Sequence, residues 1–400
     1  MTRRPSNKGS DSIRLRLREA FTPSQPVSDT RKFAGRKELL RTLIRSIEDQ
    51  QLHVVLYGDR GIGKTSLLHV LEELSRKARY IVRYTSCGEG SDFSDVFRAI
   101  ASDIPLLFHA DYDPTADAIE QGGTLSKLLP TGMLSVSQVS EMFSKVSGTR
   151  ILIILDEFDR TDFEKFRRPV AELIKNLSDR SIRVQLVIAG VASNLTELIA
   201  HIPSIRRNII GLPLPIMEKN EVRELIKIGE AVSGLKFAAE ALEDITMVAS
   251  GSPYLASLLG QHAGLIAAER GATEVAAQDV SLAVDRTLYE VKLRVSPQSL
   301  FFIESLTALH ADEHMGELAH AALVHSGRIA QEDVAAAFKT AAPAGSEARR
   351  AIEHLIEPIP NDPTGAYHFM EEGAGLYLWM SLAAERLHVT TPAPKESVSV

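Results

Sequence analysis

The chain has very little cysteine, with Cys87 as the one thiol among 400 residues. A single thiol excludes an internal disulfide, and no cysteine cluster exists that could bind zinc. Long apolar runs are also missing, because runs such as Ile151–Leu155 are far too short to cross a bilayer. The N-terminus lacks the apolar core of a signal peptide. These absences predict a cytoplasmic protein with no membrane contact.

Excess positive charge is lacking too, since the formal net charge is −7. The molecule as a whole therefore has no basic field that would draw it onto nucleic acid or acidic lipid. The charge is uneven, however. Residues 1–19 hold six basic and two acidic groups, a balance of +4, whereas residues 297–400 hold fourteen acidic and six basic groups, a balance of −8. We expect the basic segment to be a solvated leader rather than a binding arm.

The apolar pattern divides the chain into regions of different type. Residues 1–30 are polar, with Pro23 and Pro26 near their end, and predict a flexible leader and linker. Residues 31–216 alternate short apolar runs with helical periodicity, which is the pattern of an α/β fold with a parallel sheet sandwiched by helices. The Pro- and Gly-containing insertion at residues 105–135 has no role that the sequence assigns.

The strands are predicted to stop after Pro215. Residues 217–295 have only helical periodicity, and residues 296–388 combine three helical stretches with a predicted hairpin before a last helix. Three small helices with a hairpin indicate a winged-helix-like domain. Residues 389–400 are a polar tail.

The segment Gly58–Ser66 fits the pattern G-x-x-x-x-G-K-[ST] without deviation. It follows the apolar run LHVVLYG and opens a predicted helix from about Lys64 to Ala78. A triphosphate must be wrapped by backbone N–H groups, so side chains have to be absent where the loop passes closest, and the helix N-terminus adds a favourable dipole. The pattern predicts a nucleotide site made by Gly58, Asp59, Arg60, Gly61, Ile62, Gly63, Lys64, Thr65 and Ser66.

Two residues of this loop have specific predicted roles. Lys64 supplies a positive charge to the β and γ phosphates, and the Thr65 hydroxyl ligates magnesium. The alternative is a glycine-rich turn that matches by chance, and the strand before it and helix after it disfavour that. No guanine-reading N-K-x-D or T-K-x-D tetrapeptide is present, which favours ATP.

An acidic pair, Asp156 and Glu157, directly follows the five apolar residues Ile151–Leu155. The spacing from Lys64 leaves room for this strand to lie next to the first, which puts the acids beside the phosphate loop, where ligands bind in open α/β sheets. Asp156 would then hold magnesium through water, and Glu157 would be the general base for the attacking water. The alternative is a pair of solvated acids that ends a strand. We expect the nearby Asp159 to be solvated or to cap a helix.

With these motifs the chain resembles the AAA+ and STAND groups of P-loop ATPases, and in particular bacterial relatives of origin-recognition initiators and STAND signalling ATPases. FAGRKELL at Phe33–Leu40 is similar to the segment that lines the adenine pocket in the family, which implies nucleotide contacts from Phe33 and Arg36. Arg36 pairing with a nearby acid is the alternative. The resemblance also makes residues 217–295 the helical lid, where SGSPYLASLL carries a G-x-P pattern as in STAND proteins but no sensor arginine.

Two further segments acquire roles only through this resemblance. LVIAGVASNL looks like the strand whose polar residue senses the γ-phosphate, with Ser193 and Asn194 as candidates. HIPSIRRNIIGLPL looks like the arginine-finger segment, so Arg206 or Arg207 would reach the ATP of a neighbouring subunit. The alternatives are that Asn194 caps a helix and that the arginines lie at a solvated helix end.

Three hypotheses for function follow. The main one is an ATP-hydrolysing switch whose nucleotide state controls homo-oligomer assembly and the contacts of the C-terminal module with a protein partner. The second is a DNA-associated AAA+ ATPase, such as a loader or a replication or transposition accessory, which the acidic C-terminal balance disfavours. The third is a scaffold that binds nucleotide without hydrolysis.

Overall fold

The computed structural model describes residues 8–113, 115–192, 195–199, 205, 207–309, 312–325, 327–340, 345–360, 362 and 364–390. The described chain divides into two compact units. Residues 26–215 form the first, which we call the ATPase unit because it contains the phosphate loop, and residues 8–25 with 216–390 form the second, the helical unit. None of the helices in the described ranges is long and apolar enough to span a lipid bilayer.

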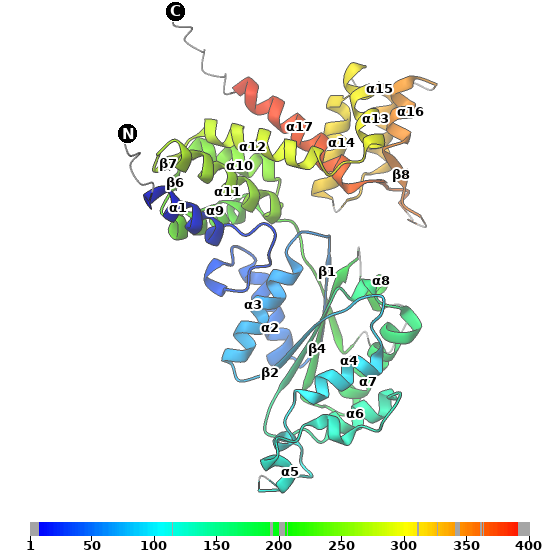
Figure 1. Cartoon of the computed structure of the whole chain (residues 1–400). Coiled ribbons are helices and arrows are strands. Elements are labelled where there is room, and N and C mark those ends of the chain that lie inside the picture. The colour runs from blue at the N-terminus through cyan, green and yellow to red at the C-terminus, as the bar shows by residue number, and fades with distance from the viewer. Residues whose placement is uncertain are drawn as a thin grey trace, which may run out of the picture. The chain divides into compact units, whose positions relative to one another are not determined.

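A five-stranded parallel sheet is the centre of the ATPase unit (Figure 1). Its strands are β1 (His53–Gly58), β2 (Ile81–Ser86), β3 (Ile151–Asp156), β4 (Val184–Val191) and β5 (Ile209–Pro213). The strands run in the order β2-β3-β4-β1-β5 with every neighbouring pair parallel. The predicted α/β class with a parallel sheet is confirmed. The expectation that β3 lies next to β1 is wrong, since β4 lies between them.

Helices cover both faces of this sheet, with α2 and α3 on one face and α4, α6 and α7 on the other (Figure 1). The buried strand residues explain this arrangement, because all six positions of β3 are buried and a strand enclosed on both sides reads as one continuous apolar run. The helices of the unit are η1 (Thr30–Lys32), α2 (Lys37–Glu48), α3 (Lys64–Lys77), α4 (Phe93–Ser102), η2 (Leu106–Phe108), α5 (Asp117–Glu120), η3 (Leu125–Leu128), α6 (Val136–Ser144), η4 (Phe158–Arg160), η5 (Phe163–Arg167), α7 (Arg168–Asp179) and α8 (Leu195–Ile199).

The insertion at residues 105–135 packs into the core of the ATPase unit. Leu106, Leu125 and Leu129 are buried in the same cluster as Phe97 of α4 and Phe143 of α6. A bridge between Pro105 and Thr124 closes the segment. Its leucines therefore tie an irregular stretch to the two helices that flank it in sequence.

The helical unit contains many helices and two pairs of very short strands. Its elements are α1 (Lys8–Ala20), α9 (Lys219–Ser233), β6 (Lys236–Phe237), α10 (Ala239–Ala249), α11 (Pro253–Glu269), β7 (Glu274–Val275), α12 (Ala277–Lys292), α13 (Pro297–Ala308), α14 (Asp312–Val324), α15 (Gln331–Thr340), α16 (Glu347–Glu353), β8 (Ile356–Pro358), β9 (Tyr367–Phe369) and α17 (Glu372–Thr390). The prediction that strands stop after Pro215 missed β6 and β7, which pair over two residues each.

The expectation of a flexible leader is wrong for residues 8–20, which form α1 against α9 and α11 (Figure 1). Leu17 is fully buried and Phe21 is 1% exposed. Space for these side chains comes from glycines on the two partner helices, since a Cβ on Gly229 would lie 2.1 Å from Phe21 Cζ and one on Gly264 would lie 2.5 Å from Leu17 Cδ2. The leader is polar in sequence, so its local pattern gave no sign that Leu17 and Phe21 would be buried against helices far along the chain.

The predicted lid and the predicted C-terminal module pack together within the helical unit. Trp379 of α17, 1% exposed, donates its Nε1–H to the carbonyl of Val248 in α10 at 2.9 Å. The His320 ring of α14 stacks on Trp379 at 4.2 Å, and its Nε2 lies 3.0 Å from Ser250 Oγ. The predicted hairpin is present as the antiparallel pair β8–β9.

Candidate functional site

The phosphate loop connects β1 to α3, as its sequence predicts. Gly58 ends the strand with a φ of 146°, and a Cβ there would lie 2.7 Å from both Ile62 Cδ1 and the carbonyl oxygen of Leu214. Only glycine fits that space. Gly63 precedes the helix at a φ of 93°, in the left-handed region that glycine adopts at low cost. The loop therefore needs its glycines for both packing and backbone conformation.

Lys64 is the first residue of α3 and is 8% exposed. Its Nζ donates to the carbonyl of Gly58 at 2.9 Å and also to that of Asp59. Burial lowers the pKa of this ammonium group, and the Asp156 carboxylate opposes that effect. The lysine thus bridges the two ends of the loop and places its charge within the curve of the backbone.

The shortest link between the loop and the acidic pair is a hydrogen bond from Thr65 Oγ1 to Asp156 Oδ2 at 2.7 Å. Asp156 is 2% exposed at the end of β3, and its Oδ1 accepts from the backbone N–H of Glu157 at 2.8 Å. The structure therefore brings together the two predicted metal-binding residues, although they are 91 residues apart in sequence. A carboxylate this deeply buried requires hydrogen-bond donors on its oxygens.

Glu157 follows with a φ of 54°, which turns the chain sharply at the carboxyl end of β3. Its Oε2 accepts from Ser86 Oγ at 3.0 Å and pairs with Arg160 Nη1 at 3.2 Å. Its side chain is 45% exposed. Both contacts engage the same oxygen, and the second oxygen of a carboxylate is a good acceptor for a water molecule.

Arg36 supports the phosphate loop through backbone carbonyls. It is 7% exposed, adopts a φ of 56° ahead of α2, and donates to the carbonyls of Ile62 and, at 3.1 Å, Pro215. The preceding segment lies along α3, where Ser66 Oγ accepts from the backbone N–H of Val27 at 3.1 Å. Phe33 closes η1 and is half-buried.

Asp159 is not the solvated acid that the sequence suggests. Its Oδ1 accepts from the backbone N–H of Val191 at 2.8 Å, and a Cβ on Gly190 would lie 2.7 Å from the same oxygen. The loop after β3 is therefore fastened to the end of β4. Gly190 permits the close approach.

The predicted sensor and finger residues are only partly within the described chain. Ser193, Asn194 and Arg206 lie outside the described residues, and Arg207 is exposed in the turn before β5. Their roles stay predictions. The G-x-P segment of the helical unit is a helix junction, where Ser250 and Gly251 have φ values of 44° and 82°.

The polar groups at the loop fit a magnesium ion in their chemistry. The Thr65 hydroxyl and the Asp156 carboxylate are hard oxygen ligands, and they already lie within 2.7 Å of each other. Magnesium binds through one or two such groups together with phosphate oxygens and water. The residues present therefore suit the metal that a triphosphate requires.

Sequence reasoning missed two neighbours of the acidic pair, Tyr84 and Ser86 of β2. Tyr84 donates its hydroxyl to Asp156 Oδ2 at 2.6 Å. Burial, and to a lesser degree the hydrogen bond to Asp156, raises the pKa of the phenol above its ordinary value. Alternate residues of a strand share one face, so polar side chains two apart at a strand end were the available signal. It becomes informative only when β2 is known to pair with β3.

The AAA ATPase domain model matches residues 32–188 of this sequence. The search of curated proteins gave no match. Among solved structures, the chain is similar to Cdc6p from Pyrobaculum aerophilum with 16% identity and a TM-score of 0.50, covering 92% of this chain and 98% of that one. A Walker-type ATPase of Pyrococcus abyssi gives 14% identity and a TM-score of 0.50, covering 89% and 98%. These two similarities indicate a shared fold.

Proposed function

We propose that this chain is an AAA+ P-loop ATPase and acts as a nucleotide-driven molecular switch. Its ATP site would be formed by Lys64, Thr65, Asp156 and Glu157. The observation that carries this proposal is the 2.7 Å hydrogen bond between Thr65 Oγ1 and Asp156 Oδ2. It joins the loop that wraps phosphate to the carboxylates that serve the metal and the attacking water.

The residues divide the work of phosphoryl transfer among them. The backbone of Gly58–Gly63 wraps the phosphates, and Lys64 turns its ammonium group from the loop carbonyls to the β and γ oxygens. Bound magnesium would neutralise developing charge on those oxygens. Thr65 and Asp156 would hold the ion in place, and Glu157 would orient a water molecule and accept its proton. Catalysis here consists of positioning and charge stabilisation.

The switch itself is supported by the packing of the helical unit. Residues predicted as lid and residues predicted as C-terminal module share buried contacts through Trp379 and His320. A displacement of the lid would therefore carry the module with it. In this proposal ATP binding changes assembly and the contacts of the module with a protein partner, Arg206 or Arg207 completes a neighbour's site, and hydrolysis resets the state.

Two variants test the ATP site. Lys64→Ala should abolish magnesium–ATP binding, because the loop loses its phosphate-binding cation. Glu157→Gln should retain ATP binding but lower turnover by about 100-fold, the usual effect of removing a general base. Equal turnover in the wild type and Glu157→Gln would remove Glu157 as the base.

The switch is tested separately by measuring molecular mass with ADP and with a slowly hydrolysed ATP analogue. A nucleotide-dependent change of mass that Arg206→Ala or Arg207→Ala eliminates supports it. A mass that is the same in both nucleotides contradicts nucleotide-controlled assembly while leaving the ATPase site intact.

DNA association is the alternative, and charge in the described part of the C-terminal region argues against it. In α16 the Arg349 guanidinium lies 4.2 Å from the Phe338 ring and pairs with Glu353 at 3.0 Å, so it is engaged within the protein. Affinity for duplex DNA depends on cations that neutralise phosphates. Retention on DNA with ATP at moderate salt, falling steeply as salt rises, would favour the alternative.

A further inference from the structure

Asp156 receives more support than the proposed mechanism uses. Two hydroxyl groups donate to its Oδ2, that of Thr65 at 2.7 Å and that of Tyr84 at 2.6 Å. Thr65 belongs to the phosphate loop itself, whereas Tyr84 comes from β2, the edge strand that pairs with β3. The second donor therefore approaches the carboxylate from an element that the proposed nucleotide site does not include.

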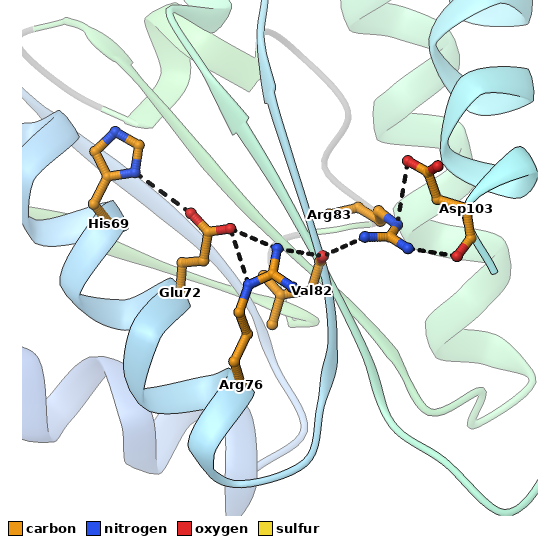
Figure 2. Close-up of polar contacts among 6 residues, drawn as sticks. All are labelled: His69, Glu72, Arg76, Val82, Arg83 and Asp103. Carbon is orange, nitrogen blue, oxygen red and sulfur yellow. Dashed lines mark hydrogen bonds and ion pairs between the residues drawn. The ribbon is translucent and has the colours of Figure 1, made fainter. Parts of the chain in front are cut away.

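The ring of Tyr84 is held in place from the other side by α3. The His69 imidazole stacks on it with ring centroids 4.7 Å apart and an angle of 22° between the planes. His69 Nδ1 lies 3.4 Å from Glu72 Oε2, and the other oxygen of Glu72 accepts from Arg76 at 2.8 Å (Figure 2). Figure 2 also shows Arg76 reaching the carbonyl of Val82 in β2, at 3.3 Å. These contacts hold the stacked pair between α3 and β2.

We infer that Tyr84, seated by His69, is a positioning residue of the magnesium site. Its hydroxyl fixes the rotation of the Asp156 carboxylate so that Oδ2 stays directed at Thr65 Oγ1. A carboxylate that is 2% exposed loses much when one of its donors is removed, because no solvent replaces the hydrogen bond. The inference rests on the proposed magnesium–ATP site and extends it to an aromatic pair outside the phosphate loop.

The test is the magnesium dependence of nucleotide binding by the full chain. Tyr84→Phe removes only the hydroxyl and keeps the ring that stacks on His69. We expect the gain in affinity for a fluorescent ATP analogue on adding Mg²⁺ to fall about ten-fold, since a hydrogen bond to a charged group is lost. Binding measured in EDTA should stay unchanged, because the phosphate loop is intact.

Activity gives a second measurement of the same effect. The Mg²⁺ concentration for half-maximal ATP hydrolysis should rise about ten-fold in Tyr84→Phe, by the same hydrogen-bond argument, while saturating Mg²⁺ restores most of kcat. The matched control is Tyr80→Phe, which changes a buried tyrosine just before β2 that lies against Arg150 instead of Asp156. The control should keep the wild-type magnesium requirement.

His69→Leu provides an independent variant that retains the Tyr84 hydroxyl but removes the stacked imidazole. A rise of about two- to three-fold in the magnesium requirement is expected, because loss of an aromatic contact costs less than loss of a charged hydrogen bond. An unchanged or lowered magnesium requirement in Tyr84→Phe overturns the inference. Loss of binding in EDTA as well would instead point to a damaged ATP site, as Lys64→Ala produces.

Discussion

Two glycines, Gly61 of the ATPase unit and Gly229 of the helical unit, are needed for opposite reasons. In the phosphate loop, Gly61 has a φ of 77°, and no atom lies within 4 Å of the position that a Cβ would take. In α9 of the helical unit, Gly229 is helical, and a Cβ there would lie 2.1 Å from Phe21 Cζ. The loop glycine provides a backbone conformation and an open space for a ligand, whereas the helix glycine provides a cavity for a side chain. Gly61 therefore supports binding, and Gly229 supports stability.

The two units can be followed separately because the chain has a single tryptophan. Trp379 lies buried in α17 of the helical unit, so its fluorescence reports unfolding there. Binding of an ATP analogue reports the phosphate loop.

The largest effect is expected for Phe21→Ala. Removing a ring that is 1% exposed leaves a cavity against Gly229 and Gly260, and the free energy of unfolding should fall by about 3–5 kcal/mol. Urea unfolding followed by Trp379 fluorescence measures it. Phe301→Ala is the control, because Phe301 is 65% exposed and its loss should change stability by about 0.5 kcal/mol or less. A wild-type transition in Phe21→Ala would contradict the docking of α1.

His53 should make the ATPase unit sensitive to acid. Burial holds its pKa at about 4, below the ordinary 6.5, and its Nδ1 accepts the backbone N–H of Leu186 at 3.0 Å. The unfolded chain takes up the proton first, so stability is complete above pH 6.5 and is lost as the pH falls toward 4, by about 3 kcal/mol in total.

The variant His53→Gln keeps an acceptor for Leu186 without a titrating ring. Between pH 7 and 4 it should lose less stability than the wild type in unfolding measured by circular dichroism. The acid response of Trp379 fluorescence should be the same in both proteins. If the ATPase unit loses as much stability in His53→Gln as in the wild type, His53 does not titrate as proposed.

A smaller loss of stability is expected for Gly229→Ala. Alanine normally favours a helix interior over glycine, but here its Cβ collides with the Phe21 ring, so the helical unit should lose about 1–3 kcal/mol. The Trp379 transition measures the loss, and ATP affinity should not change. In a Phe21→Ala background the same substitution should cost nothing or stabilise. A cost that persists there would mean the collision is not its cause.

The smallest effect is expected for Gly61→Ala, where the new Cβ meets nothing but φ is 77°. A left-handed alanine costs about 1–2 kcal/mol, which should appear as a fall in ATP affinity of about 5- to 30-fold. The Trp379 transition should stay at the wild-type position. If Gly61→Ala instead changes the unfolding of the helical unit and leaves ATP affinity normal, the role given to Gly61 is wrong.

The sequence predicts those features that depend on neighbouring residues. The phosphate loop is recognisable because its glycines, Lys64 and Thr65 are contiguous, and Asp156 because it ends an unbroken apolar strand. The position of β4 between β1 and β3 is a long-range pairing that no local pattern encodes. Tyr84 could not be identified as a neighbour of Asp156 without that strand order.

The leader shows the same limit in the helical unit. Leu17 and Phe21 are surrounded in sequence by arginines and prolines, so the local composition indicates a solvated segment. Their glycine partners, Gly264 for Leu17 and Gly229 and Gly260 for Phe21, follow more than 200 residues later. Isolated glycines in a helical pattern predict weak helices rather than a docking groove. Only the folded structure shows that these apolar side chains fill the space left by glycines, which have no side chain.

The placement of α1 has a consequence for biosynthesis. The ribosome makes Leu17 and Phe21 before the ATPase unit, and it makes the helices α9 and α11 that enclose them only after that unit. At typical rates of about 5–20 residues per second, these two side chains are exposed for roughly 10 seconds or longer. The nascent chain thus carries two uncovered apolar side chains while its nucleotide-binding unit can already fold, a period in which a chaperone or a bound nucleotide could act.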